Sequence, residues 1–504
     1  TTSEIGILIA IIVYMVGVVG IGVYFAKKNS TTNDFYLGGR KLGPLVTAMS
    51  AEASDMSSWL LMGLPGVAYV TGVCDAFWTA AGLAGTYVNW LIVAKRLRTY
   101  SDVCSAITIP DFFANRYRDP KMLKCVSAII IIIFFVPYTA SGFAACGKLF
   151  NSLFGVDYLT AMIISAIVIV AYTTLGGFLA ASTSDFIQSI IMSIALVIVL
   201  SYGIISVGGF DGVVAHVGDL KGFLSITSTH DGATNTATPY SVLSIASTLA
   251  WGLGYFGMPH ILLRFMAIED TKKLKLSRRV ASVWVVISMS VAVSIGIIGY
   301  AMSAEGVIPN LKDSETIIVQ IAHVLSTHGI IFAIIAGVIL AGILASTMST
   351  SDSQLLAASS SVSENLLEGV LSLNLSSGVK IVVARGSVII ISIIAMFLAS
   401  NPNSSVFQIV SFAWAGFGAT FGPVMLFALF WKRSNKYGAI SGMVAGGIMV
   451  FVWKFLVRPM GGVLGIYELL PAFIVASIFI VIVSLLTPAP EKEIVDEFES
   501  IKNY

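Results

Sequence analysis

Long apolar runs, separated by short polar segments, follow one another along the whole chain. An apolar run of about 18 residues or more is long enough to cross a bilayer as a helix. We therefore expect thirteen spans, at 4–26, 44–72, 75–95, 122–152, 157–174, 182–207, 241–262, 280–303, 327–366, 380–399, 405–431, 437–456 and 467–487. The run 327–366 exceeds one straight crossing, so we expect it to tilt or to extend into water.

The composition agrees with an all-α polytopic membrane protein that sits in a lipid bilayer. Of its 504 residues, 57% are hydrophobic and 11% are charged, whereas soluble domains carry about 25% charged residues. The net charge of +2 gives no indication of nucleic-acid binding. The sequence contains no nucleophilic elbow, phosphate loop or HExxH motif, and its four cysteines lack metal spacing. We therefore expect neither an enzyme nor an obligate protein partner.

Lysine and arginine predict the orientation, because they are retained on the cytoplasmic side of a membrane protein. If all thirteen spans cross, the side of the first loop holds 24 of the 29 Lys and Arg residues. We therefore expect the N-terminus outside the cell and the acidic tail after Pro490 inside, with the chain in the plasma membrane.

The stretch SAEASDMSSWLLMGLPG, residues 50–66, places two acids within an apolar run. Ionisable groups such as Glu52 and Asp55 are costly at that depth and mark functional sites by default. The small and hydroxyl residues around them weaken a regular helix, and irregular backbone is tolerated in a membrane only where it lines a cavity. The stretch predicts an interrupted helix beside a polar cavity.

A second interruption is predicted at WGLGYFGMP, which contains three glycines before Pro259. Glycine and proline destabilise a helix interior by about 1 and 3 kcal/mol. Two interruptions, at matching positions of five-span units 44–207 and 241–431, are typical of transporters built from inverted repeats, with the site between the broken helices. The alternative is close helix packing through glycine and serine. We favour the site, because one interruption carries acids and the other aromatic residues.

A stripe of hydroxyls lies on the ninth span, where four residues follow the i, i+3, i+4, i+7 spacing of one helix face. The stripe consists of Ser346, Ser349, Thr350 and Ser353. With carbonyls from a broken neighbour it would offer oxygen ligands to an alkali cation, or it would only hydrogen-bond between helices. Asp185, flanked by hydroxyls at the start of the sixth span, could bind a cation or cap its helix.

Five strings in one order resemble the sodium:solute symporter family: FYLGGRKLGP, ASDMSSWLLMGLPG, WGLGYFGMPHILLRFMA, MSTSDSQLL and SFAWAGFGATFGPV. The resemblance runs from Tyr36 to the last span. It implies a LeuT-like fold, in which two inverted five-helix repeats have one extra N-terminal and two extra C-terminal spans. The corresponding segments are 1–42 (first span and cytoplasmic loop), 43–207 (repeat one), 208–240 (external loop), 241–431 (repeat two), 432–490 (two spans) and 491–504 (acidic cytoplasmic tail). In the external loop we expect a surface helix near Val213 to Phe223, followed by a mobile loop.

The resemblance also implies a function: sodium-coupled uptake of a small solute by alternating access. It is strongest to members that carry L-proline. The alternatives are a sodium symporter for another amino acid, for pantothenate or for sialic acid, and a membrane sensor without transport. Sodium is the implied ion.

Matched by position, the family's sodium site comprises carbonyls of Ala53, Met56 and Ser346 and hydroxyls of Ser349 and Thr350. A further sodium site of some relatives corresponds to Asp185, Asp352 and Ser353. The solute-binding positions correspond to Asp55, Ser57, Trp59, Tyr138, Trp251, Tyr255 and Pro259. Arg40 matches an arginine linked to the inner gate. Glu52 departs from the family pattern, where a small or uncharged residue is usual. We expect it to face the cytoplasmic vestibule, with altered cation selectivity or proton dependence as the alternative.

Overall fold

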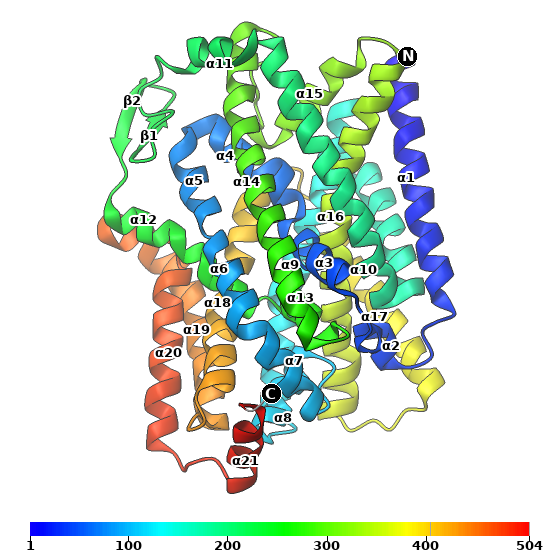
Figure 1. Ribbon diagram of the computed structural model, residues 1–504, viewed down its shortest axis with the longest axis vertical. Coiled ribbons are helices and arrows are strands. Elements are labelled where there is room, and N and C mark those ends of the chain that lie inside the picture. Colours follow the sequence, from blue (N-terminus) through cyan, green and yellow to red (C-terminus); the bar gives the residue numbers. More distant parts are fainter. Residues whose placement is uncertain (404, 503–504) are drawn as a thin grey trace.

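Long helices run side by side along the long axis of the molecule, with the N-terminus at one end and the last helix at the other (Figure 1). The computed structural model describes residues 1–403 and 405–502, and for Ser57 the backbone but not the side chain. Ten helices in the described part of the chain are long and apolar enough to cross a membrane. The prediction of a helical multi-pass membrane protein is therefore confirmed, while the number thirteen stays a prediction.

The first part of the chain contains long helices joined by short ones. Its helices are α1 (Thr2–Ala26), α2 (Thr32–Leu37), α3 (Pro44–Ser58), α4 (Leu64–Thr71), α5 (Val73–Ala81), α6 (Leu83–Val88), α7 (Ala94–Val103), α8 (Ile109–Tyr117), α9 (Met122–Phe154), α10 (Tyr158–Ser206) and α11 (Gly209–Val217). Short 3-10 or π turns lie at η1 (Gly38–Arg40), η2 (Trp59–Gly63) and η3 (Asn89–Val93).

The second part begins with a hairpin of β1 (Ser228–Asp231) and β2 (Thr236–Pro239). Its helices are α12 (Val242–Leu249), α13 (Pro259–Ala267), α14 (Leu274–Glu305), α15 (Ile317–Ser326), α16 (Ile330–Ser360), α17 (Ser377–Leu398), α18 (Val406–Phe430), α19 (Lys436–Val452), α20 (Leu469–Leu486) and α21 (Lys492–Ile501). The short turns are η4 (Ala250–Gly257), η5 (Thr271–Lys273), η6 (Ser314–Thr316), η7 (Ser361–Val370), η8 (Trp453–Val457), η9 (Arg458–Met460) and η10 (Gly462–Gly465).

The predicted interruption of the stretch 50–66 lies later than its serines, because α3 continues through ASDMSS without a break. The hydroxyl of Ser54 donates to the carbonyl of Ala51 at 2.9 Å, and a serine that bonds back to its own helix can remain helical. The irregular backbone begins one residue after the serines, as the π turn η2. Such π turns inside helices are frequent at functional sites.

The second predicted interruption is confirmed at the glycine-rich segment. The chain leaves α12 as the 3-10 segment η4, becomes extended at Met258 (φ −82°, ψ 108°) and starts α13 at Pro259. Proline suits this place, because the first turn of a helix has amide groups without intrahelical partners. At Gly254 an added Cβ would clash with the indole of Trp414. The glycine therefore lets an aromatic side chain of α18 close over the break.

Two predicted spans, 157–174 and 182–207, correspond to the two halves of α10, which are separated by a non-helical kink at Gly177. The residue has φ of 63°, a conformation that favours glycine. An added Cβ there would lie 2.7 Å from the carbonyl oxygen of Phe35. Backbone conformation and close packing both require glycine at the bend.

The external segment is more ordered than the predicted mobile loop. Its helix α11 covers 209–217 rather than 213–223, and β1 pairs with β2 in antiparallel register, with Ser228 opposite Pro239. Phe223 anchors the segment, because its buried ring lies 5.0 Å from that of Tyr300 and 5.6 Å from that of His230.

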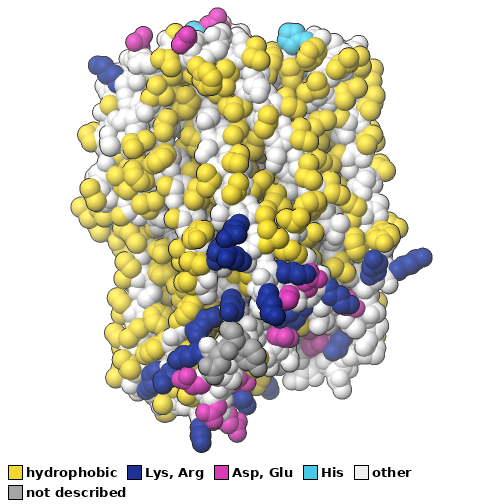
Figure 2. Space-filling view, viewed as in Figure 1, with side chains coloured by type: hydrophobic (Ala, Val, Ile, Leu, Met, Phe, Trp, Pro, Cys, Tyr) yellow, Lys and Arg dark blue, Asp and Glu magenta, His cyan; other side chains and the backbone are white. Residues whose placement is uncertain are grey.

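Basic side chains gather at the end of the molecule where α21 lies, below a broad belt of hydrophobic side chains (Figure 2). The helix α21 buries Ile494, Phe498 and Ile501 against the bundle. Arg118 pairs with two of its acids, Glu493 at 3.3 Å and Glu497 at 3.4 Å. The acidic tail is thus a docked amphipathic helix.

Candidate functional site

The helices α3 and α16 meet through polar atoms at the predicted sodium site. Ser349 Oγ donates to the carbonyl oxygen of Ala53 at 2.7 Å. The carbonyl oxygen of Ser346 accepts from Ser349 Oγ at 3.1 Å and from Thr350 Oγ1 at 3.2 Å. All four residues are buried, as is Met56, one turn after Ala53. The structure therefore gathers the predicted ligands where two helices cross.

These ligands suit a hard monovalent cation, because they are carbonyl and hydroxyl oxygens without formal charge. Transition metals favour imidazole and thiolate ligands, and in the described residues no three His, Cys, Asp or Glu side chains group together. The residues present at this crossing fit sodium.

Two narrow spaces lie next to the crossing, and in this structure both are nearly closed. The inner aromatic cavity, of about 10 Å³, is lined by Asp55, Trp59, Tyr138, Trp251, Tyr255, Val410 and Trp414. The polar cavity, which leaves no room for a water molecule, is lined by Ser58, Tyr138, Ser141, Gly142, Thr347, Thr350, Ser351 and Gln354. Tyr138 borders both cavities, and Thr350 joins the polar cavity to the predicted sodium ligands.

The structure brings most predicted solute-binding residues to the inner aromatic cavity: Asp55, Trp59, Tyr138, Trp251 and Tyr255 line it. Pro259 does not line either cavity and instead opens α13. The side chain of Ser57 lies outside the described part of the structure.

A stack of three indoles covers the inner aromatic cavity. Trp251 lies between Trp59 and Trp414, at ring distances of 5.3 and 5.4 Å and with both interplanar angles at 15°. Trp414 Nε1 also donates to the carbonyl oxygen of Trp251 at 2.7 Å. Phe407 stacks on Trp251 as well, at 6.0 Å. Four aromatic residues from η2, η4 and α18 thus pack together on this side.

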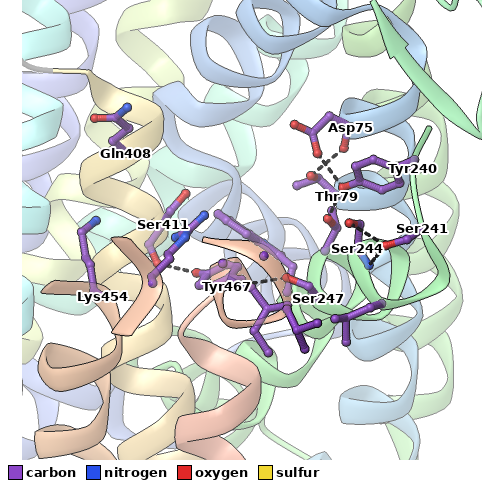
Figure 3. A pocket seen from close by; sticks show the side chains of 18 of the residues that line it. Asp75, Thr79, Tyr240, Ser241, Ser244, Ser247, Gln408, Ser411, Lys454 and Tyr467 are labelled. Carbon is purple, nitrogen blue, oxygen red and sulfur yellow. Dashed lines mark hydrogen bonds between the residues drawn. The ribbon is translucent and has the colours of Figure 1, made fainter. Parts of the chain in front are cut away.

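Beyond Trp251 lies a much larger open pocket of about 960 Å³, here called the vestibule (Figure 3). Its walls come from α5, α12, the start of α18 and the turns η8 to η10. Trp251 borders both the vestibule and the inner aromatic cavity. The indole therefore separates the two spaces.

Arg264 occupies the region of the candidate second sodium site, and the sequence did not single it out. Its Nη2 donates to Asp185 Oδ2 at 3.1 Å and to Ser353 Oγ at 2.6 Å, and its Nε donates to Ser50 Oγ at 3.0 Å. Asp352 accepts from Tyr172 OH at 2.6 Å. The predicted residues do come together, but around a buried guanidinium.

Glu52 faces the protein interior, so the expected position in a cytoplasmic vestibule is wrong for this structure. The residue is 1% exposed. Its Oε1 accepts from Trp90 Nε1 at 2.9 Å, and its Oε2 has no hydrogen-bond partner among the described residues. Trp90 belongs to the π turn η3, whose Asn89 donates to the carbonyl oxygen of Tyr255 at 2.9 Å. The turn η3 thus links α3 to the glycine-rich break.

Arg40 closes the opposite side of the bundle from the indole stack. Its Nη1 donates to Ser101 Oγ at 3.0 Å and to the carbonyl oxygen of Met266 at 2.8 Å, and Nη2 donates to the carbonyl of Ala106. Leu42 continues this closure, since its N–H donates to the carbonyl of Ala267 at 3.1 Å. Arg40 therefore ties η1 to α7, to α13 and to the segment between α7 and α8, while its role in an inner gate stays a prediction.

Sequence reasoning missed three residues of these sites: Gln354, Trp414 and Arg264. Gln354 follows Thr350 by four residues on α16, so extending the hydroxyl stripe by one turn would have found it. Trp414 lies in the quoted string SFAWAGFGATFGPV without having been assigned a role. Arg264 could have been found, because it is a charged residue only five positions after Pro259. The seventh span, however, was predicted to end at residue 262.

Comparisons with known proteins agree with the predicted family and with the helical membrane fold. A profile of the Sodium:solute symporter family matches residues 35–446. The osmoregulated proline transporter OpuE of Bacillus subtilis is 42% identical, over 97% of this chain and 96% of its own length. The high-affinity proline transporter PutP of the same species is 43% identical, with 96% and 98% covered. The sodium/proline symporter of Haemophilus influenzae is 40% identical, with 98% and 97% covered.

Solved structures show the same architecture. A Na⁺-coupled sialic acid symporter in a substrate-bound outward-open state superposes with a TM-score of 0.80 at 17% identity, over 97% of this chain and 99% of that one. The nucleobase-cation-symport-1 transporter Mhp1 gives 0.56 at 14% identity, over 93% and 98%. These two likenesses concern the fold. The match of the family profile, together with relatives above 40% identity over nearly the whole chain, shows that this chain belongs to the sodium:solute symporter family.

Proposed function

We propose that the protein couples the inward movement of sodium to the uptake of L-proline by alternating access. The observation that carries the proposal is the polar crossing of α3 and α16, where Ser349 contacts Ala53 beside the two cavities. Three relatives of about 40% identity or more are named as proline transporters or symporters. Because family membership implies transport rather than chemical conversion, the protein is not an enzyme.

The two cavities offer complementary groups for a zwitterion. Gln354 Nε2 is buried and has no hydrogen-bond partner among the described residues, so it is a free donor for the solute carboxylate in the polar cavity. Asp55 lines the inner aromatic cavity and forms no ion pair with a described cationic side chain, so it is available to the ammonium group. The pyrrolidine ring would pack against Trp251 and Tyr255. Each buried polar group then gains the partner that burial demands.

Sodium would bind through oxygens of Ala53, Met56, Ser346, Ser349 and Thr350. This ion would bridge α3 to α16 and so stabilise one arrangement of the two helices, the form in which the cavities are shaped for the solute. A ligand shifts such an equilibrium only by its difference in affinity for the two forms. Opening at Arg40 then breaks the crossing contacts and releases ion and solute to the inside.

The candidate second sodium site, at Asp185, Asp352 and Ser353, would hold the Arg264 guanidinium in place of a sodium ion. A buried carboxylate needs a cation or several hydrogen bonds, and Arg264 supplies both to Asp185. We therefore propose one sodium ion per transport cycle.

The thirteen-span arrangement and the orientation form part of the same proposal. The interrupted runs α3–η2–α4 and α12–η4–α13 would each begin one five-span repeat, and the bend at Gly177 would separate two spans of α10. With the N-terminus outside, the basic end in Figure 2 faces the cytoplasm, as the retention of Lys and Arg requires.

Uptake by purified protein in proteoliposomes tests the proposal. An inward sodium gradient should drive accumulation of radiolabelled proline above its external concentration, and lithium, potassium or protons should replace sodium poorly. A panel of unlabelled amino acids, pantothenate and sialic acid should compete less well than proline. Accumulation of a different solute, or accumulation without a sodium gradient, would refute the assignment.

A further inference from the structure

The helix α14 begins with three basic side chains that none of the transport steps above uses. This basic cluster consists of Lys275, Arg278 and Arg279, which follow the i, i+3, i+4 spacing of one helix face. Lys275 and Arg279 are exposed, and Arg278 is half-buried. None of the three forms an ion pair with a described residue, whereas Lys273, just before them, pairs with an acid. The start of α14 therefore presents a concentrated positive charge.

Arg278 differs from the other arginines that are withdrawn from solvent. Its Nε is enclosed and has no hydrogen-bond acceptor in the described part of the chain. The contact that its guanidinium does make is with the ring of Tyr87, 5.7 Å from the centroid. Each of the other buried or half-buried arginines donates to an oxygen of the protein: Arg40, Arg96, Arg98, Arg116, Arg264, Arg385 and Arg433. A sheltered donor without an acceptor is costly, so Arg278 requires a partner that these residues do not supply.

The surroundings of the basic cluster face lipid. The helix α14 packs against α6 (Figure 1) and against the π turn η3. The side chains on the outside of this groove are apolar and exposed: Tyr87, Val88, Leu91, Ile92, Leu276 and Val283.

The basic cluster also lies at the depth of the lipid headgroups. With 32 residues, α14 is about 48 Å long, whereas the hydrocarbon core is about 30 Å thick. The predicted span 280–303 begins two residues after Arg278, so the first turns extend beyond the core. Tyrosine, as at Tyr87, is enriched at this level, and Figure 2 shows basic side chains at the lower edge of the hydrophobic belt.

We propose that the groove between the start of α14 and α6 binds the headgroup of an anionic phospholipid. The planar fork of Arg278 donates two hydrogen bonds to the phosphate, the geometry for which arginine is suited. Lys275 and Arg279 flank the groove and favour a headgroup with a net negative charge over a zwitterionic one. The acyl chains lie along the exposed apolar side chains of η3 and α14. Basic pockets between membrane helices on the cytoplasmic side bind lipids of this class.

The lipid site is independent of the solute and of sodium. It takes from the proposed function only the orientation that places this end of α14 in the cytoplasmic leaflet. The bound headgroup joins α14 to α6 beside η3, the turn whose Trp90 donates to Glu52 and whose Asn89 donates to Tyr255. A ligand that binds the folded state alone raises its stability. Phosphatidylglycerol should therefore raise the melting temperature of the detergent-solubilised protein more than phosphatidylcholine with the same acyl chains.

Native mass spectrometry and thermal denaturation, with titration of the two lipids, test the site. We expect the wild type to bind phosphatidylglycerol about tenfold more tightly than phosphatidylcholine, and Arg278→Gln to lose this preference with the charged fork. Arg278→Lys keeps the charge without the fork and should keep part of the preference. The control is Lys436→Gln, because Lys436 is also a half-buried cation at the start of a helix, 5.2 Å from the ring centroid of Tyr437. It should behave as the wild type.

A second variant removes only exposed groups and so does not depend on the tolerance of the fold for Arg278→Gln. Lys275→Gln combined with Arg279→Gln should weaken binding of phosphatidylglycerol by about fivefold or more. The proposal is overturned if either this double variant or Arg278→Gln binds phosphatidylglycerol as tightly as the wild type. An equal loss in Lys436→Gln also overturns it, because attraction by the whole basic end would then explain the binding.

Free phosphate is the other source of the same anion. If inorganic phosphate at the concentration of the lipid raises the melting temperature equally, the site takes a soluble anion and the lipid proposal fails. These measurements contain neither proline nor a sodium gradient. Failure of the lipid site therefore leaves the proposed transport function standing, and failure of proline uptake leaves the lipid site standing.

Discussion

The hydroxyl of Ser349 donates a 2.7 Å hydrogen bond to the main-chain carbonyl of Ala53, joining two helices almost 300 residues apart in the sequence. The Ser349 hydroxyl now uses a lone pair of this carbonyl, which would become available to a cation if the hydroxyl turned its own oxygen toward the ion. The contact thereby makes the relative position of α3 and α16 depend on what binds between them.

Replacing Ser349 and Thr350 together by alanine should weaken sodium binding specifically. Each lost oxygen ligand is worth about 1 kcal/mol or more, so the half-saturating sodium concentration should rise about 30-fold. Sodium activation curves of proline uptake measure this. Ser360→Ala is the matched control, because Ser360 lies on the same helix, is buried and bonds only to the carbonyl of Ala357. Unchanged sodium activation in the double variant would show that these hydroxyls are not ligands.

Removing the guanidinium of Arg264 should strongly lower the stability of the folded protein. Arg264→Gln leaves Asp185 buried without its cation, which costs about 3–5 kcal/mol. We expect a large fall in the melting temperature of the detergent-solubilised protein. Asp185→Asn in the same chain should restore part of this loss, because it removes the uncompensated charge.

The same residue bears on stoichiometry. If Arg264 replaces a second sodium ion, uptake by the wild type should depend on sodium with a Hill coefficient of about one. A coefficient near two would contradict this role for Arg264, and so would a melting temperature unchanged by Arg264→Gln.

The labelling rate of Cys104 should report on the contacts by which Arg40 closes its side of the bundle. Burial raises the pKa of the Cys104 thiol to about 12, and the nearby Glu497 carboxylate contributes to the rise. At pH 8 only about one thiol in ten thousand is therefore ionised, so maleimide should react slowly and faster as the pH rises. Arg40→Ala removes the bonds to Ser101 and Met266. If these bonds stabilise the closed form by more than about 1 kcal/mol, their loss should accelerate labelling at least tenfold.

The labelling experiment uses a background in which the other three cysteines, Cys74, Cys125 and Cys146, are replaced. Arg279→Ala is the control, since Arg279 is exposed and is not one of the residues that form the closure around Arg40. Equal labelling rates in Arg40→Ala and the control would mean that Arg40 does not hold this side shut.

Glu52 and Trp90 should show strong coupling in a double-mutant cycle. Glu52→Leu leaves the indole N–H of Trp90 buried and unpaired, which costs about 1–3 kcal/mol, whereas removing both partners with Trp90→Phe should recover much of that loss. Glu52→Gln keeps an oxygen acceptor and should be tolerated within about 1 kcal/mol. Chemical or thermal denaturation measures the stability of Glu52→Leu, Trp90→Phe, their double variant and Glu52→Gln. Additive losses would exclude an energetic link between the two residues.

Hydropathy and spacing were sufficient to predict the helical architecture and the helix face that carries the hydroxyls, whereas the ion site itself stays a prediction that depends on the family resemblance. The i, i+3, i+4 spacing of Ser346, Ser349 and Thr350 places them on one face whatever the surroundings, because helix geometry alone determines it. Glycine and proline likewise predicted the break before Pro259, since their effect on a helix is local.

Other features depended on contacts between distant segments. The serines of α3 were expected to break the helix, but α3 continues through them. Ser54 donates to Ala51 within the helix, Ser50 donates to Asp185 on another helix, and the irregular backbone begins at Trp59. Arg264 was predicted to lie beyond the seventh span, because no residue near it in the sequence indicates that Asp185 contacts it. Glu52 was expected to be near water because the sequence does not reveal Trp90 as its donor. For Arg264 and Glu52 the partner is more than 35 residues away, and only the folded chain brings it within reach.

The three nearly parallel indoles of Trp59, Trp251 and Trp414 also give the protein an optical property. Aromatic chromophores about 5 Å apart couple their electronic transitions, and the sign and strength of that coupling depend on the mutual orientation of the rings. Near-ultraviolet circular dichroism therefore contains a signal from this stack that would collapse if the central indole swung away. The unlabelled protein thus carries its own spectroscopic reporter of the position of Trp251.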